Sequence, residues 1–366
     1  MTTIEDKCLI LLGAGASVEA NLPKASELFD NICSKIQKTT WKELLIKLKD
    51  LSQNNFEDSI SALEFLSTQN FSNLELNLLN ILSENKYLFS KDFLVDIYEL
   101  VDFIKRKWIN DEFLIKDPTK VKYLFPLINF CKQNNSNIFT LNYDDTVEKA
   151  ACALNVKYSI GFGDPNELKT EFFSMKNFEP INQDFNLYKL HGSIGWFISK
   201  LSSDKLYNNV YKPIEYNKNN FEDRISKPAI ILGSKNKLTA EGMYLDLLMT
   251  FRKQLNEANY IFIIGYSFSD NHINKYIQEA WMDSPDKIFF IVDPTLPDPN
   301  ILPAPSFLGG AYETKGGYDF RNLFCAVGNP NNNKLYIINK KTSEFCLQLK
   351  NNNIEVQDWC GLFANK

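Results

Sequence analysis

Four short apolar runs constrain this sequence most, because each has the length of one β-strand and each ends at a turn-forming residue. The apolar residues in each run are continuous rather than alternating, so both faces of the strand must be covered, as in a parallel sheet flanked by helices. A strand, a polar turn and a helix in succession are typical of a doubly wound α/β sheet. The runs are CLILL (8–12), NIFTL (137–141), YIFIIG (260–265) and KIFFIVD (287–293).

The segment between the first and second runs predicts helices. It carries Leu, Ile and Phe at three- and four-residue intervals with few glycines or prolines, over 41–52, 57–68, 73–84 and 89–107. A dinucleotide fold of the dehydrogenase kind would place its second strand within roughly 30 residues of the first glycine. We therefore predict a Rossmann-like doubly wound parallel sheet with a large helical insertion over about 24–130.

The remaining segments complete the predicted organisation. Residues 160–227 are richer in Asn, Phe and Tyr, and we expect loops there around an HGS segment. A proline- and glycine-rich passage follows the last run, and KLYIIN and EFCLQLK beyond it are expected to form a small hairpin or an added strand pair. The division is one α/β domain over 1–299 and a small C-terminal extension over 300–366.

Composition excludes several classes of protein. The hydrophobic share of 44% and the charged share of 23% are those of a soluble globular protein. Seven scattered cysteines without a C-x-x-C pair indicate a reducing compartment and no zinc ribbon. A net charge of −5 gives no general footprint for nucleic acid, and no run suits a membrane helix or a secretory signal. We expect a cytoplasmic protein without metal, membrane or direct nucleic-acid binding.

The first motif, LLGAGAS (11–17), follows a predicted strand. Its glycines let a pyrophosphate approach the backbone closely, and the serine can cap the next helix or contact a phosphate oxygen. A glycine turn between strand and helix is common, so a purely structural turn stays an equal alternative. The candidate binding residues are Gly13, Ala14, Gly15 and Ser17.

The second motif, TLNYDD (140–145), places Asn142 at the carboxyl end of a strand. Ligands bind at that end of the strands in open α/β sheets. Asp144 or Asp145 then begins a helix as its N-cap. The alternative, that Asn142 and Asp144 only satisfy the turn, is at least as well founded on the motif alone.

Two further motifs, KLHGS (189–193) and IGYSFSD (264–270), hold the other candidates. His191 is one of only two histidines and stands in a glycine-flanked loop. A lone histidine is more often a packing or surface residue, and the loop strengthens the case for catalysis only moderately. Main-chain N–H groups at Gly265 and the Ser267 hydroxyl are suited to a phosphate or ribose. We assign ligand contact to Ser267 and helix capping to Asp270, while His272 is expected to be structural.

Together the four motifs, in this order, resemble the sirtuin-like domains of bacterial phage-defence NAD hydrolases over roughly residues 8–295. The resemblance implies that NAD is the substrate and that Asn142 and His191 take the two catalytic positions. It places Asp144 where the nicotinamide carboxamide is held. Ser267 and Asp293 fall where the family binds the phosphate or the adenosine ribose.

Two departures separate this chain from the deacylase members of that family. It lacks their four-cysteine zinc module, and Pro23 is followed by KASEL where they carry an Asp-Phe-Arg signature. Both favour hydrolysis of the dinucleotide itself, so the resemblance implies an NAD+ glycohydrolase that releases nicotinamide as an abortive-infection effector. The alternatives are an NAD-dependent protein deacylase and a non-catalytic NAD or nucleotide sensor.

Control of such an activity must come from assembly, since no second sensor domain is recognisable in the chain. The predicted helical insertion offers a packing surface, and closed homo-oligomers are the usual soluble assemblies. We therefore expect a homo-oligomer. The resemblance also implies one partner, a ring-forming P-loop ATPase that translocates on DNA.

Overall fold

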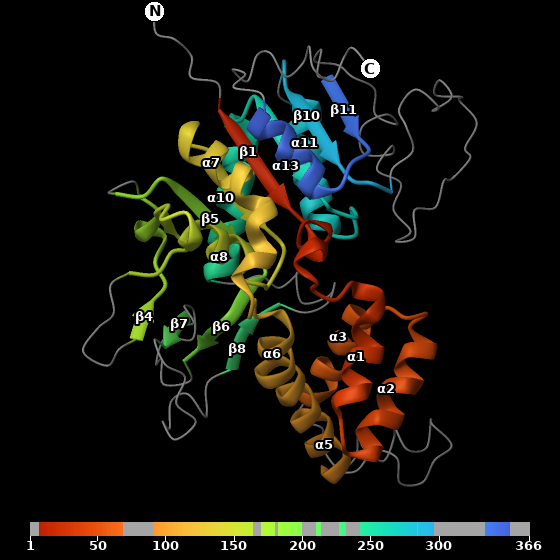
Figure 1. Ribbon diagram of the computed structural model, residues 1–366. Helices are drawn as coiled ribbons and strands as arrows, with labels where there is room; N and C mark the ends of the chain where they lie inside the picture. The colour runs from red at the N-terminus through yellow and green to blue at the C-terminus, as the bar shows by residue number, and fades with distance from the viewer. Residues whose placement is uncertain are drawn as a thin grey trace, which may run out of the picture. The chain divides into compact units, whose positions relative to one another are not determined.

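A computed structural model divides the chain into two compact units, a sheet unit and a helical unit (Figure 1). The sheet unit contains Met1–Leu22, Ile115–Ala229 and Glu241–Lys366, and the helical unit contains Pro23–Leu114 and Ile230–Ala240. The structure describes residues 7–68, 91–163, 170–179, 182–199, 210–213, 227–231, 242–283, 285–295 and 334–351.

A seven-stranded sheet forms the centre of the sheet unit, and every pairing in it is parallel. The strand order is β11-β10-β9-β1-β2-β5-β3, which confirms the predicted doubly wound α/β fold and puts the first strand of the chain in the middle. The strands are β1 (Cys8–Leu12), β2 (Asn137–Thr140), β3 (Tyr158–Ser159), β5 (Phe185–Lys189), β9 (Tyr260–Ile264), β10 (Ile288–Val292) and β11 (Lys334–Ile338).

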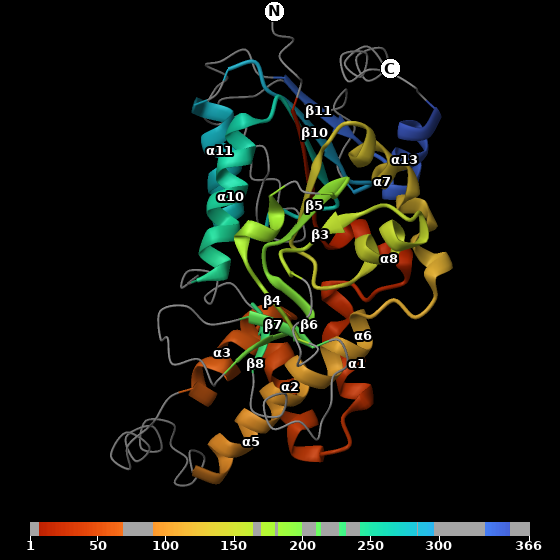
Figure 2. The same ribbon diagram turned by 90° about the vertical axis from the view of Figure 1, so that its left-hand side faces the viewer.

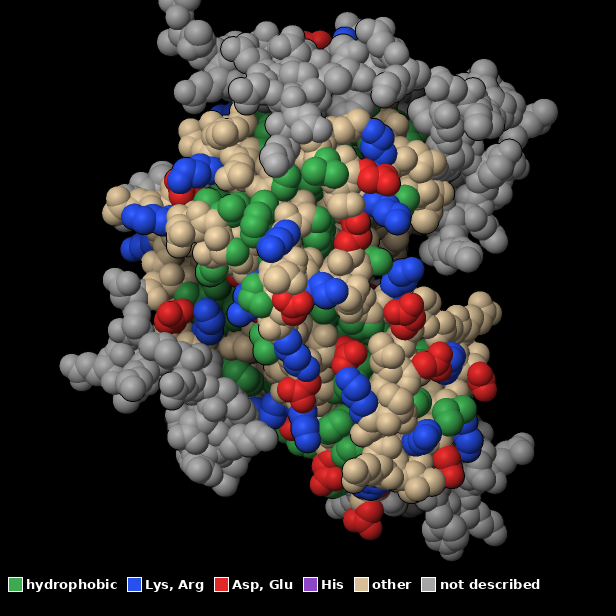
Figure 3. Space-filling view, in the orientation of Figure 1, with side chains coloured by type: hydrophobic (Ala, Val, Ile, Leu, Met, Phe, Trp, Pro, Cys, Tyr) green, Lys and Arg blue, Asp and Glu red, His purple; other side chains and the backbone are tan. Residues whose placement is uncertain are grey.

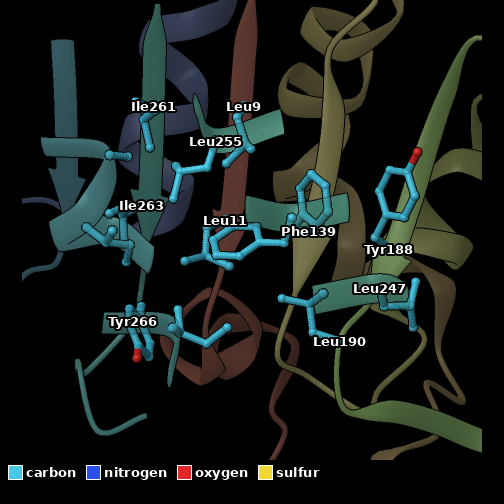
Figure 4. Close-up of a cluster of buried hydrophobic side chains, with 14 of the residues drawn as sticks. Leu9, Leu11, Phe139, Tyr188, Leu190, Leu247, Leu255, Ile261, Ile263 and Tyr266 are labelled. Atoms are coloured by element: carbon cyan, nitrogen blue, oxygen red, sulfur yellow. The ribbon is translucent and has the colours of Figure 1, made fainter. Parts of the chain in front are cut away.

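Helices cover both faces of this sheet, which explains why its strands are continuously apolar. On one face, α10 (Met243–Glu257) packs Leu247 and Leu255 into the cluster that contains Leu9, Leu11 and Ile263 of the strands (Figure 4). Helix α11 (Asn271–Asp283) lies beside α10 on that face (Figure 2).

The opposite face is covered by α7 (Phe125–Gln133) and α13 (Thr342–Asn351). Phe262 of β9 contacts Phe130 of α7 at 5.8 Å and Phe345 of α13 at 6.1 Å between ring centroids. Helix α8 (Thr146–Ala153) packs against α7. None of the helices within the described ranges is long and apolar enough to cross a membrane.

The helical unit is built around an aromatic core. Phe56 contacts Phe29 at 5.1 Å and Trp108 at 5.6 Å between ring centroids. The helices predicted over 41–52, 57–68 and 89–107 are confirmed, and 73–84 lies outside the described residues. The elements are η2 (Ala25–Glu27), α1 (Leu28–Lys35), α2 (Thr39–Leu51), α3 (Phe56–Thr68), α5 (Lys91–Asp102), the π-helical η3 (Phe103–Trp108) and α6 (Ile109–Phe113).

The helical unit ends earlier along the chain than the predicted insertion. It stops at Leu114, whereas the sequence pattern continued the insertion to about 130. The 3-10 helix η4 (Pro118–Leu124) and α7 belong instead to the sheet unit, because Phe130 packs on the sheet. Their apolar spacing is the same as that of the helices before them, so periodicity alone does not mark the boundary.

The prediction of loops over 160–227 is wrong. A second sheet forms there, in the order β4-β7-β6-β8, and it packs Trp196 and Tyr211 in buried positions. Glycine and asparagine suggested turns, but aromatic residues between them have high strand propensity. The elements are β4 (Thr170–Phe172), η5 (Met175–Phe178), β6 (Gly192–Ile198), β7 (Val210–Pro213) and β8 (Lys227–Ile230).

The hairpin or added strand pair predicted near the C-terminus is correct only for its first strand. KLYII forms β11, which pairs with β10 in parallel and extends the main sheet. EFCLQLK lies in α13, because Phe345, Cys346 and Leu349 fall on one face of a helix and are buried there. A strand would have put Phe345 and Cys346 on opposite faces.

Candidate functional site

The topology brings the sequence motifs to one edge of the sheet. Five adjacent parallel strands, β10, β9, β1, β2 and β5, end at this edge, and each is followed within two residues by a candidate residue of a motif. Carboxyl ends of parallel strands are where open α/β sheets bind ligands. In strand order the residues are Asp293, then Gly265 and Ser267, then Gly13, Ala14, Gly15 and Ser17, then Asn142 and Asp144, and last His191.

The glycines of the first motif are required by close packing of two loops. Gly13 N donates to Ile264 O at 3.0 Å, and Gly15 N donates to Gly265 O at 2.8 Å. A Cβ at Gly15 would lie 2.7 Å from Gly265 Cα. Gly265 has φ +63°, and a Cβ there would lie 2.3 Å from Ala16 N. This contact is a structural reason for the glycines that holds without any ligand.

Ser17 lies inside the 3-10 helix η1 (Ala14–Ala20) and does not cap it. A capping residue stands just before the first residue of its helix, but η1 begins at Ala14, three residues before Ser17. The predicted capping role of Ser17 is therefore wrong. The buried Ser17 hydroxyl instead lies 3.0 Å from Asn142 Nδ2 and 3.4 Å from Thr146 Oγ1. Ser17 therefore links the first and second motifs.

The Asn142 side chain is anchored by its amide nitrogen. Nδ2 donates to Gly13 O at 2.9 Å and to Ser17 Oγ at 3.0 Å, and the main-chain N donates to Thr140 Oγ1 at 3.0 Å. A main-chain carbonyl can only accept, so the amide nitrogen must face Gly13. The amide oxygen Oδ1 then points the other way, and it is suited to accept a hydrogen bond from a water or a hydroxyl group.

Asp144 is buried in the turn before helix α8, whose N-cap is Asp145. Asp144 Oδ1 accepts from Thr146 N at 3.1 Å and from Thr146 Oγ1 at 2.6 Å. Its main-chain oxygen accepts from the ammonium of Lys189, which also pairs with Glu148 at 2.7 Å. Burial raises the pKa of the Glu148 carboxyl, and the Lys189 ammonium opposes that shift. These contacts give Asp144 the turn role that the motif left open.

His191 is buried at the end of β5, with 5% of its surface exposed. Leu190 N donates to Thr140 O at 2.9 Å and fixes the chain beside β2. His191 Nε2 lies 3.1 Å from Asp270 Oδ2, and its ring centroid lies 6.5 Å from that of Tyr143. The histidine is thus a desolvated side chain paired with an equally buried carboxyl group.

Ser267 and Asp293 make local contacts. The exposed Ser267 hydroxyl lies 3.1 Å from Ser269 Oγ. Asp293 Oδ1 accepts from Thr295 N at 2.8 Å and from Thr295 Oγ1 at 2.6 Å. Both residues lie at the same sheet edge as Asn142, but these contacts fix each one only within its own turn.

Sequence reasoning missed two side chains near these motifs. Asp270 caps α11, as predicted, but it also pairs with His191. Lys189 is buried and holds Asp144 and Glu148. The sequence feature that could have identified Lys189 is its position at the end of the strand FNLYK. A lysine that is buried there needs an ionic or polar partner.

The described residues include no group of three or more His, Cys, Asp or Glu side chains that could hold a metal ion. The cysteines in the described ranges form no disulfide bond with one another; they are Cys8, Cys33, Cys131, Cys152 and Cys346. Cys325 and Cys360 lie outside the described ranges. The candidate site within the described ranges consists of the hydrogen bonds of Asn142 and the buried pair of His191 and Asp270.

Residues 136–304 match the family of SIR2-like domains. This stretch begins just before β2 and contains Asn142, His191, Ser267 and Asp293, whereas the glycine turn after β1 precedes it. No protein with a curated description matches the chain in sequence.

The solved structures that resemble this chain include sirtuins. A Sir2 complex with a p53 peptide and NAD+ is 10% identical, with 94% of this chain and 92% of that chain covered and a TM-score of 0.41. A sirtuin structure that concerns substrate affinity is 10% identical, with 95% and 94% covered and a TM-score of 0.43. A mutant Sir2 homologue bound to ADP-ribose is 13% identical, with 99% and 95% covered and a TM-score of 0.42.

Proposed function

We propose that this chain is an NAD+ glycohydrolase with Asn142 and His191 at its reaction centre. The observation that carries the proposal is the anchoring of Asn142 on the glycine turn of β1, which leaves its amide oxygen as an acceptor at the ligand-binding edge of the sheet. The match of residues 136–304 to SIR2-like domains supports a dinucleotide at that edge. NAD+ is present in the Sir2–p53 peptide complex that resembles this chain.

The reaction breaks the bond between the anomeric carbon of the ribose and the nicotinamide nitrogen. Nicotinamide leaves as a neutral base, so the main demand is to stabilise positive charge on the sugar and to present a water. The water oxygen bonds to the anomeric carbon, and its proton passes to a base and then to solvent. The products are ADP-ribose, nicotinamide and one proton.

Each residue has a role that follows from its atoms. Asn142 Oδ1 accepts from the attacking water or a ribose hydroxyl, and the imidazole of His191 accepts the proton. Asp144 lies two residues after Asn142 and is proposed to contact the carboxamide of nicotinamide when the dinucleotide is bound. The pyrophosphate is assigned to the turn Gly13–Ser17 and to Gly265 and Ser267, and the adenosine ribose to Asp293.

We expect the purified chain to release nicotinamide from NAD+ without any acylated peptide. The reason is that the proposed base and acceptor act on water, so no acyl-lysine is required. Nicotinamide and ADP-ribose are measured by chromatography, with heat-denatured protein as the control and zinc content measured on the same sample. Release that depends on acyl-lysine would favour a deacylase, and tight NAD binding without release would favour a sensor.

The biological role that we propose is abortive infection in bacterial phage defence, with activity controlled by assembly. Large apolar side chains are exposed on the helical unit, among them Leu51, Phe65 and Val95. Exposed apolar groups of this kind are suited to contacts with other protein surfaces. Figure 3 shows basic and acidic side chains intermixed on the face in view, rather than gathered as a nucleic-acid site would need.

We therefore expect the chain to form homo-oligomers in solution and its NAD turnover to depend on assembly. Light scattering gives the mass, and turnover is measured across protein concentration, with and without the product of the neighbouring gene, which we propose to be a ring-forming P-loop ATPase. Replacing Leu51 and Val95 with Lys should lower the mass if the helical unit forms the interface. A monomer with full turnover that needs no partner would contradict control by assembly.

A further inference from the structure

Asp270 holds two different groups with its two carboxylate oxygens. Oδ1 accepts from the main-chain N of His272 at 3.0 Å and of Ile273 at 3.4 Å, and so caps helix α11. Oδ2 lies 3.1 Å from His191 Nε2, with the side chains of Asp270 and His191 only 4% and 6% exposed. A cap needs one oxygen. The second oxygen, aimed at a buried imidazole, is not explained by capping.

The loop that carries Asp270 is held in place by its own hydrogen bonds. Asp270 N donates to the Tyr266 hydroxyl at 3.1 Å, and Asn274 Nδ2 donates to Phe268 O at 2.7 Å. Phe268 has φ +56°, a left-handed conformation that is unfavourable for an aromatic residue. Backbone strain of this kind persists where the surroundings impose it, often at functional sites. The carboxylate therefore has a fixed direction.

His191 is held from its own side of the site. Gly192 has φ +78°, and a Cβ there would lie 1.8 Å from Ala229 O, so the turn after the histidine admits only glycine. The strands that lead to His191 and Asp270, β5 and β9, flank β1 and β2 in the sheet. The pair therefore joins the loops on either side of the Asn142 anchor.

We propose that Asp270 is the positioning residue of His191. Its carboxylate holds the proton of the neutral imidazole on Nε2, which makes Nδ1 the nitrogen that accepts a proton. The inference rests on the proposed hydrolysis for its chemical consequence. When Nδ1 takes the proton of the attacking water, the carboxylate stabilises the imidazolium, and the proton later returns from Nδ1 to solvent.

Asp270→Asn tests the proposal. An asparagine oxygen still caps α11, so the amide NH2 faces His191 Nε2 and favours the tautomer with its proton on Nδ1. We expect kcat to fall at least about tenfold while KM changes less than about threefold. Asp117→Asn is the matched control, because Asp117 Oδ1 caps η4 by accepting from Thr119 N at 2.9 Å. Its kcat should equal that of the unsubstituted protein.

A second readout needs no turnover. The chain has two histidines, so side-chain ¹⁵N NMR of labelled protein reports His191 directly, with His272 as the internal reference. We expect Nε2–H in the unsubstituted protein and a change toward Nδ1–H in Asp270→Asn, with Asp117→Asn unchanged. The ¹⁵N signals that are lost in His191→Gln are assigned to His191, and those that stay belong to His272.

The outcomes separate this inference from the proposed function. A tautomer change together with a fall in kcat supports Asp270 as the positioning residue. An Nδ1–H form in the unsubstituted protein, or an unchanged kcat in Asp270→Asn, overturns it. If the tautomer changes but the unsubstituted protein hydrolyses no NAD, the pairing is supported as a device that sets the histidine and the proposed hydrolysis is wrong.

Discussion

Replacing either Asn142 or His191 with Ala is expected to lower NAD turnover at least about a hundredfold, the usual scale for loss of a positioning group or a base. Asn142→Ala removes the acceptor that is anchored through Gly13, and His191→Ala removes the proposed base. Turnover is measured as nicotinamide release at saturating NAD+. Both variants should keep the circular dichroism of the folded protein, because neither side chain supplies much apolar core.

Two matched controls accompany these variants. The Asn134 side chain donates to a main-chain carbonyl, that of Phe130, at 2.9 Å, but it lies before β2 rather than after it. His272 is the other histidine, and its Ala variant keeps the main-chain N–H that Asp270 accepts. Asn134→Ala and His272→Ala should both retain turnover. Near-normal turnover in Asn142→Ala or His191→Ala would show that the site is assigned to the wrong residues.

Lys189→Met is expected to lower the free energy of unfolding by about 3 kcal/mol, the scale for breaking a buried ion pair by removing one partner. The Lys189 ammonium is completely buried and serves both the Glu148 carboxylate and the Asp144 carbonyl. Without the ammonium, the Glu148 carboxylate and the Asp144 carbonyl lose their hydrogen-bond donor while they are buried away from water. Urea unfolding followed by circular dichroism gives the change.

The comparison for this prediction is Lys212→Met. Lys212 pairs with Glu171 at 3.9 Å, with 41% of the lysine side chain exposed. Exposed pairs contribute about 0–1 kcal/mol, so this variant should unfold close to the unsubstituted protein. Equal midpoints for the two methionine variants would mean that the buried pair adds no more stability than the exposed one.

The strands β1, β2, β9 and β10 could be predicted because each apolar run is continuous, rich in β-branched or aromatic residues and followed by a turn-forming residue. The helix formed by EFCLQLK could not be predicted, because a short apolar run fits a strand or a helix equally well until its burial pattern is known. The strand β6 was hidden by Gly192 and Gly195, which predict turns but here are positive-φ residues within a strand.

The candidate site was partly predictable for a physical reason. Carboxyl ends of parallel strands share one edge, so Asn142, which follows a predicted strand, could be placed there from the sequence. His191 could not be placed there, because its strand β5 lies in the segment that was expected to form loops. The pairing of His191 with Asp270 could not be predicted from the sequence. It joins loops after strands that are not neighbours, and it depends on how far each loop turns back over β1 and β2.

The central position of β1 determines when the candidate site can assemble during synthesis of the chain. Leu9 pairs with Asn137 on one side and with Ile261 on the other, so the strand that is translated first waits for partners that are translated much later. Contacts between such distant parts of a chain form slowly. The Asn142 anchor needs the turn after β1, and His191 needs Asp270, which follows β9. A nascent chain that ends before Asp270 would therefore hold no assembled site, and the proposed hydrolysis could begin only after that residue has been made.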